Sequence, residues 1–393
     1  MYIQRTSESR LIALLEDRKV VIILGARQVG KTTLVQRILD DRKVVSLNFD
    51  LEIDKLRFQA AASLSPVDAL QSLGNPEYLV VDEAQRLPQT GRIVKGWYDA
   101  SLPVKILLLG SSSLELLDHA TESLTGRNEK LFLPPLLFDE VIRSRNWCPE
   151  AMPLPDIARH FTEPVRTCLL QSLAFGGYPE VVTTADKPSL LRNLSSDYLW
   201  KDILQTGLVK SPDLIKRLLM LLAHRIGSEV SVHELATQLH MARQTVERYF
   251  ELLEQTWVIF RLPSFSTNPR KEIAKSRKIY FWDTGIRNAL LGTFSTDELR
   301  PDIGSLWENW VIAEVAKQNG LLGGLSELYF WRSRAKSEVD LVVRTGDRLR
   351  AFEIKWKGRR PVGRAFHAMY GIDVEMLDAG NPFAVANALA RKN

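Results

Sequence analysis

Short apolar runs recur along the first third of the chain, each followed by small or polar residues. The runs lie in residues 19–24 (KVVIIL), 78–83 (YLVVDE) and 105–113 (KILLLGSSS). Continuous β-branched and leucine-rich stretches of this length are typical of strands buried on both faces of a parallel sheet. The pattern therefore predicts an α/β fold whose functional side chains follow the carboxyl ends of its strands.

The first run leads into a segment of the form G-x-x-x-x-G-K-[ST], a phosphate-binding loop. Its residues are Gly25, Ala26, Arg27, Gln28, Val29, Gly30, Lys31 and Thr32, and Thr33 follows in the first turn of a predicted helix. The glycines let backbone N–H groups point at phosphate oxygens, and the helix adds the positive end of its dipole. Lys31 would reach the β- and γ-phosphates, and Thr32 would coordinate Mg²⁺. We therefore expect residues 25–33 to bind ATP, with Mg²⁺ as the second cofactor.

The ends of the next two runs carry candidate catalytic groups. Asp82 would hold Mg²⁺, and Glu83 would orient and polarise the attacking water. Ser111 or Ser112 would sense the γ-phosphate or hold the water, unless this segment is an ordinary Gly/Ser turn. Arg127 would supply charge to the transition state, in its own site or in that of a neighbouring subunit. The alternative for Arg127 is a solvated loop arginine.

The middle of the chain is mostly helical by its pattern. Apolar residues recur at helical spacing within residues 146–225, and Gly176-Gly177-Tyr178-Pro179 interrupts them. This region would be a helical lid over the nucleotide, or a plain spacer between domains.

A helix-turn-helix pattern follows. Ser231 and Glu234 form a capping box that opens a helix over residues 232–239, and a second helix is predicted over residues 243–254. Four residues of the second helix would face outward, where a major groove of DNA would lie: Arg243, Gln244, Glu247 and Arg248. Of these, Arg243, Gln244 and Arg248 would contact DNA.

Two predicted strands, residues 257–262 and 278–282, complete a winged helix. The segment 270–278 between them carries five basic residues and one acid. These basic residues would contact DNA phosphates: Arg270, Lys271, Lys275, Arg277 and Lys278. Winged helices also dock proteins, and a charge run is often a solvated face, so protein docking is the alternative.

The region from residue 304 predicts the order helix, three strands, helix, strand, which resembles the core of PD-(D/E)XK nucleases. A hairpin about residue 346 would set position 340 against 352, which brings Asp340 to the level of Glu353. Alternation places Glu353 and Lys355 on one face of the strand. Asp340, Glu353 and Glu308 of the preceding helix would bind Mg²⁺, and Lys355 would orient or deprotonate water. The alternative is a strand that merely pairs charges on an exposed face.

Composition narrows the class of protein. The chain has 393 residues, of which 45% are hydrophobic and 25% charged, with a net charge of +5, an ordinary globular balance. Two cysteines exclude a disulfide framework and a four-cysteine zinc site. No apolar run approaches the roughly 18 residues of a membrane helix, and the polar start does not resemble a signal peptide. We therefore expect a cytoplasmic protein without a membrane partner.

Several strings occur in one order along almost the whole chain: GARQVGKTT, VVDEAQ, LLGSSS, LTGR, LPPLLFDE, FGGYPEVV and KIYFWDTGIRNALLG. In this combination the chain resembles the AAA+-type ATPases of bacteria and archaea that carry a C-terminal domain of unknown function. The resemblance implies an AAA+-like ATPase core, a helical region, a winged helix and a nuclease-like C-terminal fold.

These patterns divide the chain into an ATPase domain (1–145), a helical lid or linker (146–227), a winged helix (228–300) and a nuclease-like domain (301–393). The favoured function is an ATPase that couples ATP binding and hydrolysis to remodelling of branched DNA or of junctions between single strands and duplex. Metal-dependent cleavage is left open. The alternative is a nucleotide-controlled switch that docks protein or regulates transcription on a non-catalytic scaffold. A role for Arg127 in a neighbouring site would require a homo-oligomer.

Overall fold

A computed structural model of the chain describes residues 2–111, 124–198, 211–266, 277–333, 335–358 and 363–389. Its contacts divide the chain into two compact units. The first consists of Gln4–Pro134, and the second of Met1–Ile3 together with Pro135–Asn393. Each unit contains a sheet with accompanying helices, so the predicted α/β class is confirmed.

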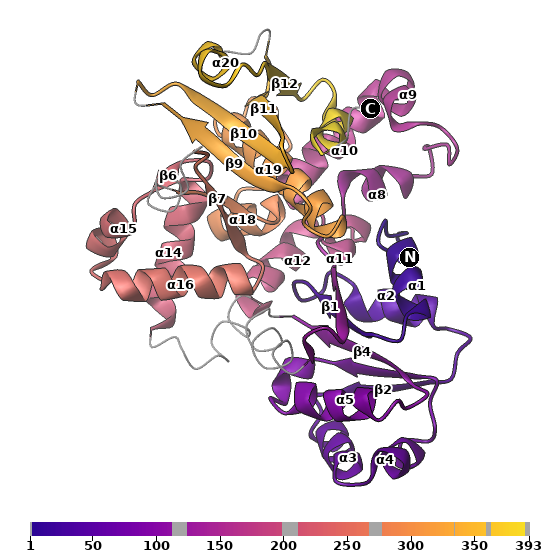
Figure 1. Cartoon of the computed structure of the whole chain (residues 1–393). Helices are drawn as coiled ribbons and strands as arrows, with labels where there is room; N and C mark the ends of the chain where they lie inside the picture. Colours follow the sequence, from indigo (N-terminus) through magenta and orange to yellow (C-terminus); the bar gives the residue numbers. More distant parts are fainter. Residues whose placement is uncertain are drawn as a thin grey trace. The chain divides into compact units, whose positions relative to one another are not determined.

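The unit Gln4–Pro134 is built on a five-stranded parallel sheet in the order β2-β3-β4-β1-β5 (Figure 1). Its strands are β1 (Val20–Leu24), β2 (Val44–Asn48), β3 (Tyr78–Asp82), β4 (Lys105–Gly110) and β5 (Asn128–Phe132). Its helices are α1 (Glu8–Glu16), α2 (Lys31–Ile38), α3 (Glu52–Ala62), α4 (Pro66–Ser72), η1 (Ala84–Arg86) and α5 (Thr90–Asp99). All five residues of β1 are buried, which is why this strand reads as one continuous apolar run.

The second unit begins with short helices. They are α8 (Phe138–Arg143), α9 (Leu154–His160), α10 (Thr162–Phe175), α11 (Pro179–Thr183), α12 (Lys187–Asn193), η3 (Leu194–Tyr198), α14 (Pro212–His224) and α18 (Thr284–Leu291). The described residues of the region 146–225 are therefore mostly helical, as predicted. Among the described residues, no helix combines the length and apolar character needed to cross a membrane.

A buried aspartate joins two segments of this unit that are far apart in the sequence. Asp283 accepts hydrogen bonds from the backbone N–H groups of Gly177 (2.7 Å), Gly285 (2.9 Å) and Ile286 (3.2 Å). A Cβ atom on Gly176 would lie 1.9 Å from the Asp283 carboxylate, so the chain has to be glycine there. The strings FGGYPEVV and KIYFWDTGIRNALLG therefore form one packed joint.

A small antiparallel sheet in the order β6-β8-β7 accompanies the helix-turn-helix segment. The elements are β6 (Glu229–Val230), α15 (Val232–Leu239), α16 (Arg243–Gln255), β7 (Ile259–Pro263) and β8 (Arg277–Phe281). His240 adopts a left-handed conformation (φ 52°) in the turn between α15 and α16. The two helices and two strands thus lie within a few residues of the predicted positions.

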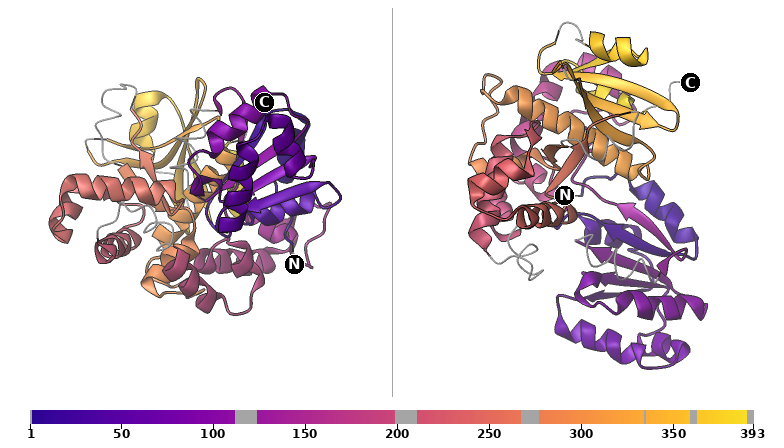
Figure 2. Two further views of the ribbon diagram at one scale, coloured as in Figure 1. Left: turned by 90° about the horizontal axis from the view of Figure 1, so that it is seen from below. Right: turned by 60° about the vertical axis from the view of Figure 1, so that its left-hand side comes forward.

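The C-terminal sheet has the order β12-β11-β10-β9, with β11 and β12 parallel and the other pairs antiparallel. Its elements are α19 (Ile303–Leu321), β9 (Glu327–Arg332), β10 (Glu338–Thr345), β11 (Arg348–Lys355), α20 (Arg364–Tyr370), β12 (Val374–Asp378) and η4 (Pro382–Ala388). The right-hand view of Figure 2 shows the orange helix α19 beside the orange and yellow strands. The predicted order of helix, three strands, helix and strand is confirmed.

Replacing Asp283 with alanine should destabilise the protein strongly. Three backbone N–H groups would lose their acceptor in a buried site, at a cost of about 3 kcal/mol or more in the free energy of unfolding. Urea unfolding followed by circular dichroism measures this loss. Asp297→Ala is the matched control, because Asp297 accepts one N–H bond (Leu299, 2.8 Å) in an exposed turn. Equal losses in the two variants would contradict the role assigned to Asp283.

Candidate functional site

The predicted phosphate-binding segment lies between β1 and α2, as a strand, a loop and a helix. Gly30 (φ 94°) and Gln28 (φ 57°) adopt left-handed conformations, which reverse the direction of the loop. A Cβ atom on Gly25 would lie 2.1 Å from the carbonyl oxygen of Leu133. Only glycine fits at this position, so the close approach of the backbone requires the first residue of the motif.

Lys31 is folded back over the loop. Its side chain is buried, and its Nζ donates to the carbonyl oxygens of Gly25 and Ala26 at 2.8 Å each. A buried ammonium group needs acceptors, and here the loop itself supplies them. The positive charge is thereby held directly beside the loop whose N–H groups would bind phosphate.

Arg5 is a functional neighbour that the sequence pattern does not reveal. Its side chain is buried, and its guanidinium donates to the carbonyl oxygens of Val29 (2.9 Å) and Pro134 (2.6 Å). It therefore ties the phosphate loop to the chain that follows β5. An isolated arginine before the first helix carries no sequence signal for this contact.

The predicted magnesium ligands lie next to each other. The hydroxyl of Thr32 donates to Oδ2 of Asp82 at 2.6 Å, and Oδ1 of Asp82 accepts the backbone N–H of Glu83 at 2.9 Å. Hydroxyl and carboxylate oxygens are suitable ligands for Mg²⁺, which binds few protein groups and keeps several waters. The donor set therefore fits the metal that the sequence predicts.

Glu83 and Ser111 are also brought together. Oε2 of Glu83 accepts hydrogen bonds from Nε2 of Gln85 (2.5 Å) and from the hydroxyl of Ser111 (3.1 Å) at the end of β4. Glu83 has a left-handed backbone (φ 50°), a conformation that costs energy for a residue with a side chain and that clusters at functional sites. Ser112, the alternative to Ser111, lies outside the described residues.

Arg127 lies at the opposite edge of the sheet. Its carbonyl oxygen accepts the N–H of Val20 at the start of β1, and its Nε donates to Asp99 at 2.7 Å. The phosphate loop follows the other end of β1, five residues on, which is roughly 16 Å at about 3.3 Å per residue. The expectation that Arg127 serves the site of its own chain is therefore wrong, and a role in a neighbouring subunit stays a prediction.

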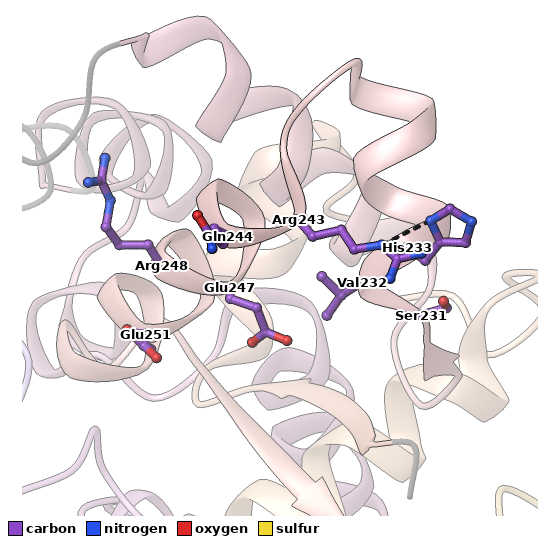
Figure 3. Close-up of a pocket in the computed structure, with 8 residues that line it drawn as sticks. All are labelled: Ser231, Val232, His233, Arg243, Gln244, Glu247, Arg248 and Glu251. Atoms are coloured by element: carbon purple, nitrogen blue, oxygen red, sulfur yellow. Dashed lines mark hydrogen bonds between the residues drawn. The ribbon is translucent and has the colours of Figure 1, made fainter. Parts of the chain in front are cut away.

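The helix-turn-helix segment forms a second candidate site. A hollow of about 600 Å³ lies over α15 and α16 (Figure 3), lined by Ser231, Val232, His233, Arg243, Gln244, Glu247, Arg248 and Glu251. Arg243 reaches across to α15, where its Nε donates to Nδ1 of His233 at 3.2 Å. The three residues expected to contact DNA thus share one open surface with two glutamates, and of these Glu247 lies 3.5 Å from Arg261.

The basic segment before β8 agrees only in part with the prediction. Arg270, Lys271 and Lys275 lie outside the described residues, and Arg277 is exposed at the start of β8. Lys278 is only 2% exposed and lies 3.0 Å from Glu308 and 2.6 Å from Glu338. The expectation that Lys278 contacts DNA is therefore wrong. Successive side chains of a strand such as β8 point to opposite faces of the sheet, which a count of charges along the sequence ignores.

The predicted pair of carboxylates in the C-terminal sheet is present. Leu341 lies opposite Phe352, so Asp340 falls beside Glu353, one residue from the register expected from the hairpin. Nζ of Lys355 lies 2.9 Å from Glu353 and 3.3 Å from Asp340. Oε2 of Glu353 is buried and accepts no hydrogen bond from the described residues.

Glu308 has a different role from the one predicted. Its Oε1 accepts hydrogen bonds from the hydroxyl of Tyr280 (2.7 Å) and from Lys278 (3.0 Å). Burial raises the pKa of Glu308, the nearby charge of Asp340 raises it further, and Lys278 opposes both. Across the described ranges, no three acidic, histidine or cysteine side chains are placed to share a metal. The predicted metal ligands in this domain are thereby reduced to Asp340 and Glu353.

Three regions of the chain match models of known domain families. Residues 17–142 match the model of an AAA domain, residues 166–297 match a domain of unknown function (DUF8612), and residues 303–386 match another (DUF4143). The chain is therefore similar to an AAA domain over residues 17–142 and to DUF4143 over residues 303–386.

Relatives cover most of the chain. An uncharacterized protein of Mycobacterium tuberculosis is 29% identical over 373 residues, which cover 93% of this chain and 76% of that protein. An uncharacterized protein of Methanocaldococcus jannaschii is 26% identical over 363 residues, covering 87% and 75%. A Walker-type ATPase of Pyrococcus abyssi has the same fold, with a TM-score of 0.50 and 17% identity, and covers 74% of this chain and 96% of that one.

Two neighbouring basic residues should respond differently to substitution. Burial opposes the charge of Lys278, but Glu308 and Glu338 outweigh it and raise the pKa of the ammonium group, which is therefore charged at neutral pH. Lys278→Met should lower the free energy of unfolding by about 3 kcal/mol, because Glu308 loses its cation in a buried site and Glu338 keeps only the 3.5 Å contact with Arg332. Arg277→Gln, on the exposed neighbour, should change it by less than about 0.5 kcal/mol. Thermal unfolding at pH 7 measures both, and similar midpoints would contradict the buried ion pairs.

Proposed function

We propose that the chain is a Mg²⁺-dependent ATPase that binds DNA and couples ATP binding and hydrolysis to its remodelling. Branched DNA and junctions between single strands and duplex are the proposed substrates. The observation that carries the proposal is the 2.6 Å contact between Thr32 and Asp82, directly beside the phosphate loop. It supports a site in which Thr32 and Asp82 would together hold one metal ion beside the bound triphosphate.

Different residues of the ATPase domain would bind the phosphates, hold the metal and orient the attacking water. The N–H groups of residues 25–33 and the ammonium group of Lys31 would bind the phosphates, and Thr32 and Asp82 would hold the metal. The metal, when bound, supplies positive charge to the phosphate oxygens. Glu83 would orient the attacking water, and Ser111 and Gln85 keep its carboxylate in place through the hydrogen bonds described above. Arg127 would contribute only to a neighbouring subunit, which makes a homo-oligomer part of the proposal.

The surface of α16 supports binding of DNA. Arg243 and Gln244 are exposed at the first turns of the helix, and Arg248 lines the same hollow. Arginine and glutamine side chains form hydrogen bonds with base edges in a major groove, and arginine also contacts phosphates. Arg277 would add one phosphate contact from the start of β8.

Cleavage of DNA and a purely structural C-terminal domain are both consistent with the carboxylate pair. Oε2 of Glu353, which accepts no hydrogen bond within the described part of the chain, supports metal binding with Asp340, because a buried carboxylate oxygen is costly without a partner. The contacts of Lys355 with both acids favour the second candidate function, a nucleotide-controlled switch on a non-catalytic scaffold. In that candidate function, Lys355 rather than a metal ion balances the negative charges of Asp340 and Glu353.

Two substitutions separate nucleotide binding from hydrolysis. Lys31→Ala should weaken ATP binding about 100-fold, because the phosphates lose a charge-assisted contact. Glu83→Gln should bind ATP within about threefold of the unchanged chain and lower kcat by about 100-fold or more. Calorimetry and phosphate release measure the two effects, with Glu77→Gln, exposed at the other end of β3, as the control. Unchanged turnover in both variants would remove the assigned roles.

Removing the arginines of α16 should weaken binding of DNA. The double substitution Arg243→Gln and Arg248→Gln should reduce affinity and lower the slope of log affinity against log salt by about two. Arg159→Gln, at an exposed position of α9, is the control, and it removes one charge where the double substitution removes two. Binding, ATP turnover and cleavage should be followed on linear, forked and four-way DNA with Mg²⁺, with Asp340→Ala as the test of cleavage. Turnover unaffected by any DNA, together with no salt-sensitive binding, would favour the switch.

A further inference from the structure

Arg27 is a second cation of the phosphate loop whose surroundings suggest a specific task. Its guanidinium lies between two carboxylates, 3.7 Å from Glu83 at the end of β3 and 3.8 Å from Asp50 after β2. The side chain is 15% exposed, so the guanidinium lies largely away from water. Arg27 is thus placed beside the residue that would orient the attacking water.

Neither carboxylate depends on Arg27 for its position. Glu83 accepts hydrogen bonds from Gln85 and Ser111, and Asp50 lies 3.2 Å from the Nε atom of Arg86. Both separations from Arg27 exceed hydrogen-bond length, so these pairs are loose. A guanidinium presents several N–H donors in a fork that matches the oxygens of a phosphate group. A terminal phosphate beside Glu83 would therefore be a better partner for Arg27 than the two acids.

We propose that Arg27 distinguishes ATP from ADP, by exchanging its loose pairs with Glu83 and Asp50 for hydrogen bonds to the terminal phosphate. This inference rests on the proposed ATP site. It assigns the terminal phosphate to Arg27 because Glu83, which Arg27 faces, would act at that end of the nucleotide. The loop N–H groups, in contrast, would bind ATP and ADP alike through the β-phosphate, and Lys31 would reach the β-phosphate of both nucleotides as well as the γ-phosphate of ATP.

The test compares two affinities in each of several variants. A non-hydrolysable ATP analogue and ADP each displace a fluorescent ADP derivative in the presence of Mg²⁺. Arg27→Gln should weaken binding of the analogue 10- to 100-fold and of ADP less than threefold, with Arg27→Lys in between. Arg86→Gln is the matched control, because Arg86 shares Asp50 with Arg27 but forms no pair with Glu83 in the described contacts. Its two affinities should stay within threefold.

A double-mutant cycle tests the exchange itself. Asp50→Asn removes one of the two competing acids, so it should strengthen binding of the analogue when Arg27 is present. In the Arg27→Gln background the same change should have a smaller effect, because no cation is left to release. Thermal unfolding without nucleotide confirms that each variant is folded.

The outcomes separate this inference from the ATP site on which it rests. If the unchanged chain binds neither nucleotide, both are wrong. If it binds both and Lys31→Ala abolishes binding, but Arg27→Gln loses affinity equally for the analogue and ADP, or loses none, only the role of Arg27 is wrong. Additive effects in the Asp50 cycle would also overturn the exchange.

Discussion

The common direction of the five strands in the N-terminal sheet is the constraint on which the nucleotide site depends. Parallel pairing places every carboxyl end at one edge, and β4 lies between β1 and β3. The loop after β1, Ser111 after β4 and the acids after β3 must therefore meet there. The same constraint keeps Arg127, at the amino end of β5, away from the site of its own chain. Parallel pairing thus brings the phosphate loop, the acids after β3 and Ser111 together, and it keeps Arg127 apart from them.

The sequence alone predicted the features that are encoded within a single short segment of the chain. The phosphate loop and the acids at the end of β3 each lie in one short segment, and parallel pairing was enough to bring Thr32 to Asp82. The contact of Arg5 with the loop could not be predicted, because it joins residues 24 and 129 positions apart. The buried position of Lys278 was missed for another reason. Its charge was counted with those of its neighbours, but its face of β8 is set by pairing with β6 and β7.

The helix-turn-helix segment and the C-terminal sheet share buried contacts. Ser264, just after β7, bridges Phe330 of β9, and the N–H of Phe265 donates to the carbonyl oxygen of Phe330 at 2.6 Å. Phe265 packs into the core of the C-terminal sheet with Tyr329 and Trp331. Buried pairs between β8 and α19 add to this joint. The surface over α15 and α16 and the pair Asp340–Glu353 therefore belong to the same compact unit.

Both units balance their carboxylates with cations of the same chain, but with different strength. Lys278 is almost fully buried and lies 2.6 and 3.0 Å from its two acids, so its removal would leave the charge of Glu308 without a cation in a largely buried site. Arg27 lies 3.7 and 3.8 Å from its acids, and each of these has other partners. A cation with short contacts and no access to water is part of the framework. A cation with long contacts, next to the predicted phosphate loop, can exchange one of these partners for another. Burial and distance together therefore separate a structural ion pair from an exchangeable one, although sequence alone shows the same types of residue in both.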